Sequence, residues 1–427
     1  MAPPTKVNAN FKGVTQAGSD CGGCQPPDAG ATVGNSQIVE AVNLRLEVYS
    51  KTGTAKCGVG LNTFLGTSRA LSDPHVIFDN VNNRFSMVVT VVPTSGSKPA
   101  LYLLASKTSS PCGSWWRYHL TFSGAAFPAG TLLDYPYLGQ DRSSLLLSAN
   151  NFCCGGPPFH YTTSQAFSIA KSLAYAGKPL STSTFAVAFS TAPATVAGIP
   201  METTTTTYFL AAVPGVGYDL YSMASSPGSP ITLQAQISAP YTAPTRRVHQ
   251  PGTTKTLDPS DGRIPWVPVF SQNFIWFAHG ANLNGHPSVR YGAISVLSNT
   301  AVVAMAYHSA TSDDFNPSIG VADAGSNIVY AWVNWAYTSS SHGVATTDVV
   351  DGVLPGTGVP NLIGTDLVLV QGSKTTSNSR FGDFSSVAVD PSAVSSSCPA
   401  GQTAVTNQEY FTSDGKWATR LARLSFC

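Results

Sequence analysis

The chain has 427 residues, of which 43% are hydrophobic and 11% carry a charge, and its formal net charge is +1. The charged share is less than half of the roughly 25% usual in soluble globular domains. Such a chain can bury a large core, but it has no global field that would attract nucleic acid or an anionic membrane. It also has no long apolar run and no basic cluster, so we expect neither membrane insertion nor a nucleic-acid partner.

The start of the chain and its eight cysteines bear on the compartment. Met1-Ala2-Pro3-Pro4 has neither the basic start nor the apolar stretch of a signal peptide, so we interpret Met1 as an initiator placed on a mature, exported chain. An even number of cysteines among many loops indicates disulfides, and we expect a secreted, extracellular protein. Cys21-Gly-Gly-Cys24 also has zinc-ligand spacing; no matching second pair exists, so structural zinc is a minor alternative.

Residues 75–120 show the structural unit most clearly. Its four strands are expected at His75–Asp79, Arg84–Thr90, Ala100–Ala105 and Trp115–Leu120. Asn82-Asn83 makes a tight turn between the first two strands, because Asn tolerates turn conformations. Four consecutive strands joined in this way form one antiparallel meander, the shape of a propeller blade.

The unit recurs along the chain. Polar residues stand at the expected starts of its first strands, at Asp73, Asp134, Glu202, Asp261, Asn316 and Asp383. A partial earlier unit begins near Gln37, and the length then holds about seven units. We therefore predict an all-β, seven-bladed β-propeller of four-stranded antiparallel blades. Six blades is the main alternative, whereas an array of β-sandwiches would show linkers that are not visible.

The last unit has three obvious strands, Phe384–Asp390, Thr403–Phe411 and Ala418–Phe426. Residues 8–14 are expected to supply its fourth strand, so that residues 1–427 form a single closed domain without open sheet edges. In this topology the expected disulfides are Cys57–Cys112, Cys398–Cys427, Cys21–Cys24 and Cys153–Cys154. The first two lie on the lower face and the last two on the upper face.

Several segments resemble a family of exported bacterial propeller proteins, largely uncharacterised and called sialidase-like by shape. These segments are residues 26–34, 73–79, 113–118, 134–139, 261–263, 315–319 and 380–391. The resemblance covers nearly the whole chain and implies the propeller fold. It implies no activity, since one fold hosts many functions.

The polar residues at the blade starts should converge at one end of the central channel, which we call the upper mouth. Three explanations are open for this group: hydrogen bonds to neighbouring turns, a bound cation, or catalysis. A cation held by hard oxygen ligands would be calcium, bound by Asp73, Asp134 and Asp383. Crowded carboxylates also raise one another's pKa, which supplies a general acid beside an ionised partner.

For catalysis we predict Glu202 and Asp261 as the acid/base pair of a glycoside-cleaving site. Tyr135 or Tyr137 would assist proton transfer, and Arg263 and Arg380 would hold an acidic group of the substrate. Loops on the upper face add aromatic and imidazole groups suited to sugar rings. The substrate-binding candidates in these loops are His160, His279, Trp335 and Tyr337.

Other chemistries find less support in the sequence. His160, His279, His286 and His342 could bind a transition metal, but no HxH or HExxH spacing is present. The sialidase turn motif appears only as the off-pattern Ser413–Trp417 segment, and no Gly-x-Ser-x-Gly, Walker or dinucleotide motif occurs. We therefore predict a monomeric, secreted polysaccharide hydrolase or lyase. The alternative is a non-catalytic carbohydrate-binding or adhesion module.

Overall fold

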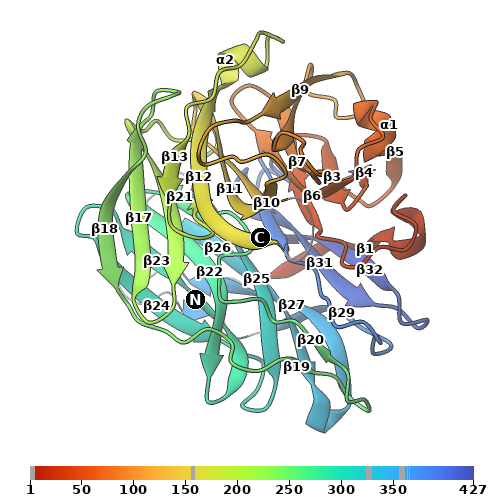
Figure 1. Ribbon diagram of the computed structural model, residues 1–427. Coiled ribbons are helices and arrows are strands. Elements are labelled where there is room, and N and C mark those ends of the chain that lie inside the picture. The colour runs from red at the N-terminus through yellow and green to blue at the C-terminus, as the bar shows by residue number, and fades with distance from the viewer. Residues whose placement is uncertain (1–4, 155–158, 324–328, 355–360, 363, 365) are drawn as a thin grey trace.

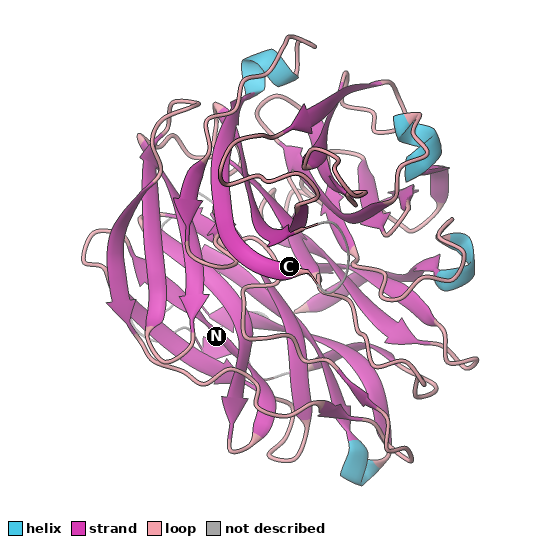
Figure 2. Cartoon of the chain, in the orientation of Figure 1, coloured by secondary structure: helices cyan, strands magenta, loops and turns pink. Residues whose placement is uncertain are grey.

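The computed structural model describes residues 5–154, 159–323, 329–354, 361–362, 364 and 366–427. Within them nearly all regular structure is β-strand (Figure 2). The described helices are η1 (Gln16–Gly18), α1 (Leu61–Leu65), α2 (Lys171–Ala174) and η2 (Ser340–His342). None of these is long and apolar enough to cross a membrane.

Seven antiparallel sheets surround a central channel, so the fold is a seven-bladed β-propeller, as predicted (Figure 1). Blade 1 consists of β2 (Gly30–Val33), β3 (Gln37–Val42), β4 (Arg45–Ser50) and β5 (Ala55–Gly60). Blade 2 consists of β6 (Leu71–Asp79), β7 (Arg84–Val91), β8 (Ala100–Ser106) and β9 (Trp115–Thr121). Blade 3 consists of β10 (Leu132–Gln140), β11 (Ser144–Cys153), β12 (His160–Ala170) and β13 (Phe185–Val187).

The next three blades are less regular. Blade 4 consists of β14 (Ala192–Pro193), β16 (Thr206–Val213), β17 (Gly217–Ala224) and β18 (Thr232–Ser238). Blade 5 consists of β21 (Val269–Ser271), β22 (Phe274–Leu283), β23 (His286–Ser295) and β24 (Thr300–Ala306), with β15 (Thr195–Val196) parallel to β21. Blade 6 consists of β25 (Asp313–Asp323), β26 (Val329–Ser339), β27 (Val344–Leu354), β28 (Asn361–Leu362) and β29 (Leu367–Gln371). Residues 239–268, between blades 4 and 5, form an insertion that carries the small hairpin of β19 (Val248–His249) and β20 (Thr256–Leu257).

Blade 7 combines the two ends of the described chain. It consists of β30 (Ser386–Val389), β31 (Thr403–Phe411), β32 (Trp417–Ser425) and β1 (Lys6–Thr15). β1 pairs antiparallel with β32, with Lys6 opposite Ser425 and Phe11 opposite Leu421. This is the closing contact that the sequence suggested, and it covers the open edge of β32.

Local sequence explains why the blades form where they do. In blade 2 the Asp79 carboxylate accepts hydrogen bonds from the N–H groups of Val81 and Asn82, and Asn83 adopts a left-handed backbone with φ of 53°. This turn joins β6 to β7 and places Phe78 opposite Phe85. Both rings then pack into an apolar core shared by blades 1 and 2. Close inter-blade packing also requires glycine at Gly320, where a Cβ atom would lie 2.4 Å from the Val387 side chain.

Two blade starts differ from the predicted ones. The inner strand of blade 1 is β2, which begins at Gly30 and precedes the expected start near Gln37. The inner strand of blade 4 is β14, which precedes Glu202 rather than following it. Both strands are too short, at four and two residues, to show a hydrophobic pattern.

The four disulfides pair as predicted. They are Cys21–Cys24, Cys57–Cys112, Cys153–Cys154 and Cys398–Cys427. Cys57–Cys112 joins β5 of blade 1 to the β8–β9 loop of blade 2 and therefore links neighbouring blades.

A buried ion pair joins blades 2 and 3. The Lys171 ammonium lies 2.7 Å from the Asp79 carboxylate and 2.9 Å from Oε1 of Gln140, and both charged side chains are almost fully buried. Removing one partner leaves an uncompensated buried charge. We therefore expect Lys171→Met to lower the free energy of unfolding by about 3–5 kcal/mol in a denaturant titration. The control Lys178→Met, in the same segment but exposed, should change it by less than about 0.5 kcal/mol. Equal stability of the two variants would contradict this prediction.

Candidate active site

The upper mouth is the end of the channel at which the inner strands begin. The pairing register of three inner strands, β6, β10 and β25, slips at a bulge near their start. Each bulge holds a residue with positive φ: Asp73 (54°), Tyr135 (56°) and Asn316 (50°). Asp and Asn tolerate this backbone, whereas a bulky tyrosine is strained in it. Part of the preference for Asp and Asn at blade starts is therefore a backbone requirement.

Four aspartates interact at the upper mouth: Asp28, Asp73, Asp134 and Asp383. The Asp28 carboxylate accepts a hydrogen bond of 2.9 Å from the Asp383 N–H, and Asp73 accepts one of 3.2 Å from the Tyr135 N–H. Three of the five predicted carboxylates, Asp73, Asp134 and Asp383, are thus brought together. Asp28 joins them from the segment before β2.

Burial and mutual repulsion favour protons on these carboxyls. Burial, followed by the charges of Asp73 and Asp383, raises the pKa of Asp134 to about 7. Burial also raises the pKa of Asp383 to about 6, although the Arg380 charge opposes the shift. The pKa of Asp28 is raised well above its ordinary value by burial and by Asp383. These carboxyls therefore keep their protons at pH values at which isolated aspartates, with pKa values near 4, have released them.

Two arginines oppose the acidic group. The Arg263 guanidinium binds Asp261 through two hydrogen bonds, one of them 2.7 Å from Nε, and lies 4.4 Å above the Tyr135 ring. Although burial opposes ionisation, the hydrogen bonds and charge of Arg263 hold the pKa of Asp261 below its ordinary value. Arg380 donates a hydrogen bond of 3.0 Å to Asp383. Asp261 is therefore ionised at a pH at which Asp134 still binds a proton.

These groups open into a polar cavity of about 560 Å³. Asp134, Arg380 and Asp383 line its blade side, and residues 244–247, 258–261 and 263 of the insertion line its other side. The insertion is anchored over the mouth by hydrogen bonds from Arg247 and the Asp258 N–H to the Ser379 carbonyl. The volume suits a small-molecule or oligosaccharide ligand.

Glu202, predicted as one half of the acid/base pair, lies at the other end of the channel. It follows β15, and its carboxylate accepts a hydrogen bond of 3.3 Å from the N–H of Gln272, in the turn after β21. The prediction was wrong because Glu202 does not begin an inner strand. Of the predicted pair, only Asp261 lines the upper cavity.

Tyr135 and Tyr137 are buried, and their hydroxyls are already bound to the backbone. The Tyr135 O–H donates to the Asp383 carbonyl at 2.5 Å, and the Tyr137 O–H donates to the Ile264 carbonyl at 2.6 Å. Burial raises the pKa of both phenols. Both hydroxyls are thus engaged with the segments that carry Asp383 and Arg263, and their part in proton transfer stays a prediction.

Three of the predicted sugar contacts are core residues. Trp335 is fully buried and donates a hydrogen bond of 2.9 Å to Asp314. Tyr337 is buried in the same core and stacks on His308. His279 is fully buried, with a hydrogen bond of 2.9 Å to the Tyr218 hydroxyl, and burial lowers its pKa to about 3. These side chains point into the blades, so their assignment as substrate platforms was wrong.

The remaining predicted histidines are dispersed. His160 is exposed at the start of β12, His286 lies 2.9 Å from the Asp313 carboxylate, and His342 contacts the Ser339 hydroxyl. Within the described residues, no three His, Cys, Asp or Glu side chains are grouped as ligands of one ion. Calcium at Asp73, Asp134 and Asp383 remains a prediction.

Five polar groups of the site were not predicted from the sequence. Asp28 lies just before the inner strand β2, so a correct start for blade 1 would have found it. Glu409 of β31 is buried beneath the mouth and accepts a hydrogen bond of 2.6 Å from the Gly382 N–H. The other three belong to the insertion, which has almost no strand pattern: Arg246, Arg247 and Asp258.

The raised pKa values predict how stability depends on pH. Folded Asp134 and Asp383 bind protons that the unfolded chain releases near pH 4, so their contribution to stability is lost as pH rises through about 6 and 7. Each proton contributes at most about 1.4 kcal/mol per pH unit. Between pH 5 and pH 8 we expect the free energy of unfolding of the wild type to fall by about 2 kcal/mol relative to that of Asp134→Asn, as measured by denaturant titration. For the exposed control Asp414→Asn, the free energy of unfolding should change with pH as it does in the wild type. The same pH dependence in Asp134→Asn would contradict the expectation.

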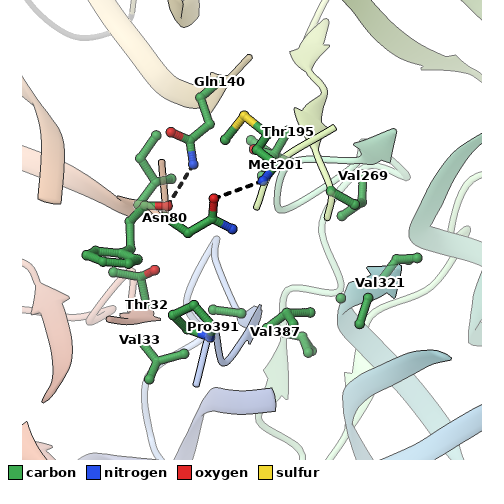
Figure 3. A pocket seen from close by; sticks show the side chains of 18 of the residues that line it. Thr32, Val33, Asn80, Gln140, Thr195, Met201, Val269, Val321, Val387 and Pro391 are labelled. Atoms are coloured by element: carbon green, nitrogen blue, oxygen red, sulfur yellow. Dashed lines mark hydrogen bonds between the residues drawn. The ribbon is translucent and has the colours of Figure 1, made fainter. Parts of the chain in front are cut away.

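A second cavity, of about 110 Å³, lies toward the lower end of the channel (Figure 3). Aliphatic side chains such as Val33, Val321 and Val387 line it, and none of its lining residues is charged. Two of its polar side chains are engaged: Gln140 donates to the Phe78 carbonyl, and Asn80 accepts from the Met201 N–H. Without an acid or base it offers no site for bond cleavage.

No family model matches the sequence, and no curated protein matches it. One similar solved structure is the Saccharomyces cerevisiae complex of Dbp5 with Nup159, Gle1, IP6 and ADP, at 10% identity, covering 99% of this chain and 96% of that one with a TM-score of 0.44. Trypanosoma rangeli sialidase matches at 10% identity, 99% and 60% coverage and a TM-score of 0.41. A Cellvibrio cellulosa α-L-arabinanase mutant matches at 9% identity, 79% and 95% coverage and a TM-score of 0.37. Likeness at this level assigns no residue role or activity to this chain.

Proposed function

We propose that this protein is a secreted, carbohydrate-active propeller that hydrolyses a polysaccharide in the upper cavity. One observation carries the proposal: Asp134 and Asp261 line the same cavity, and their surroundings shift their pKa values in opposite directions. Two carboxyls whose pKa values differ in this way supply the protonated acid and the ionised partner that glycoside hydrolysis needs.

In the proposed reaction the Asp134 carboxyl protonates the leaving glycosidic oxygen. The Asp261 carboxylate, held in its ionised form by Arg263, acts on the other side of the sugar. It serves either as the base that deprotonates the water attacking the anomeric carbon, or as the nucleophile that forms a glycosyl ester, which water then hydrolyses. Within the described residues no protein group donates a hydrogen bond to the Asp134 carboxyl, so it is open to the cavity. A lyase reaction is less well supported, because the nearby phenols are bound to backbone carbonyls.

A second candidate is a non-catalytic glycan-binding module. It is favoured by the ion pairs of Arg263 with Asp261 and of Arg380 with Asp383, which fix both arginines in place. Fixed polar side chains can hold a glycan by hydrogen bonds without cleaving it. The two functions predict different results with one panel of neutral and acidic polysaccharides.

The test is to incubate the protein with that panel at pH 6, and to measure new reducing ends and retention of protein on each immobilised polymer. Hydrolysis predicts reducing ends from at least one member of the panel. Retention without product would favour the binding module. Neither product nor retention on any polymer would overturn the proposed function.

A further inference from the structure

The insertion builds one wall of the upper cavity, and we call residues 244–247 and 258–260 the insertion wall. It is held firmly to blades 6 and 7. The Thr338 hydroxyl donates to the His249 carbonyl at 2.8 Å, and Gln250 and Thr376 exchange hydrogen bonds of 3.1 and 2.9 Å. The wall is therefore preorganised before any ligand arrives.

Two arginines on this wall retain hydrogen-bonding capacity. Arg246 uses Nη2 for Asp313 and His286, within the described residues its Nη1 donates no hydrogen bond, and 37% of its side chain is exposed. Arg247 donates to the Ser379 carbonyl at 2.7 Å, to the Thr256 hydroxyl at 3.1 Å and to Asp258 at 3.4 Å, which leaves two of its five N–H groups for a ligand, and 44% of its side chain is exposed. A guanidinium carries five N–H donors in a planar fork that matches carboxylate and sulfate oxygens.

The charge balance of the cavity favours an anion. Its lining contains four arginines and four aspartates, and their positions are Arg246, Arg247, Arg263, Arg380, Asp134, Asp258, Asp261 and Asp383. Because the pKa values of Asp134 and Asp383 are raised to about 7 and 6, both carry less than full charge in mildly acidic solution. The summed charge of these eight lining residues is then positive, although the whole chain carries only +1.

We infer that the polysaccharide bound in the upper cavity is acidic, and that Arg246 and Arg247 bind its carboxylate or sulfate groups. This inference rests on the proposed function and names its substrate class. The sugar unit to be cleaved then lies between the insertion wall and Asp134. Arginine is suited to this role because its fork binds two anionic oxygens at once, which a lysine ammonium does not.

The experiment measures dissociation constants at pH 6 and low salt for three probes: polygalacturonate, dextran sulfate and neutral dextran. Wild type should bind at least one acidic polymer tenfold or more tightly than dextran. Arg246→Gln and Arg247→Gln should each weaken that binding about tenfold, and Arg246→Lys should restore only part of it. Arg69→Gln removes the same charge from an exposed position outside the cavity and should leave binding unchanged. If Arg246→Gln loses stability with its Asp313 pair, Arg247→Gln carries the test.

Preference for polygalacturonate alone would identify a uronate, and preference for dextran sulfate alone would identify a sulfate ester. Equal binding of acidic and neutral polymers, or an equal loss in Arg69→Gln, would overturn the inference. Cleavage of a neutral polymer without any preference for acidic ones would leave the proposed hydrolysis standing and remove the inference. Arginine-dependent binding of an acidic polymer without cleavage would support the inferred ligand class and remove the proposed hydrolysis.

Discussion

Asp134→Asn is expected to slow polysaccharide cleavage by 100-fold or more while leaving the fold and the binding of substrate intact. Asparagine keeps the size of the side chain but cannot donate a proton to the leaving oxygen, and general acid catalysis is worth about 10² to 10⁴ in rate. Asp261→Asn should cause a loss of similar size, because it removes the ionised partner. Initial rates of reducing-end release on the best substrate of the panel measure both effects.

The matched control is Glu202→Gln, since Glu202 lies at the other end of the channel and an amide oxygen can still accept the hydrogen bond from Gln272. Its rate should stay within about twofold of wild type. The wild-type rate should also fall as pH rises through about 7, where Asp134 loses its proton. A large loss in Glu202→Gln together with a normal rate in Asp134→Asn would reject the assigned acid.

Deleting residues 1–14 is expected to lower the free energy of unfolding on the order of 5 kcal/mol, or to prevent folding. The deletion removes nearly all of β1 and exposes the edge of β32. It also removes the Phe11 ring, whose centroid lies 5.3 Å from that of Tyr49. The Val14 N–H, which donates to the fully buried Glu40 carboxylate at 3.0 Å, is lost as well. Thermal and denaturant unfolding of the purified variant measure the loss.

A point variant keeps this prediction testable if the deletion does not fold. A Cβ atom at Gly13 would lie 2.4 Å from Leu421 and 2.6 Å from the Glu40 carboxylate, so Gly13→Val should destabilise the closing contact by about 1–3 kcal/mol. Lys12→Ala, at the exposed neighbouring position, should be nearly neutral. A deletion variant that melts like wild type would show that β1 does not stabilise the ring.

The fold could be predicted where strands are long enough to show alternation and turns carry their own signals. The expected strand Arg84–Thr90 differs from β7 by one residue, because Asn83 and the flanking apolar runs mark its limits. Short inner strands carry no such pattern. β14 has two residues, so spacing alone placed a blade start at Glu202.

The site could be predicted only in part, because residue type does not determine where a side chain points. Asp134 and Asp383 were found since they lie at or just before the starts of inner strands. His279 and Trp335 were expected in loops of the upper face, but they lie on β22 and β26 and their side chains face the core. Arg246 and Arg247 reach the mouth only through tertiary anchoring of the insertion, for which no local pattern exists.

The pairing of β1 with β32 joins residues about 400 positions apart, as the contact between Lys6 and the Cys427 carbonyl also shows. Six blades can form from neighbouring segments as the chain is synthesised, but blade 7 must wait for its last strand. Until then β1 is an unpaired strand, and such edges invite pairing with other chains. Lys6 and Lys12, both exposed on β1, place positive charge on this unpaired strand, which opposes its pairing with other chains before β32 forms. Ring closure is therefore the step at which slow folding and aggregation of this protein compete.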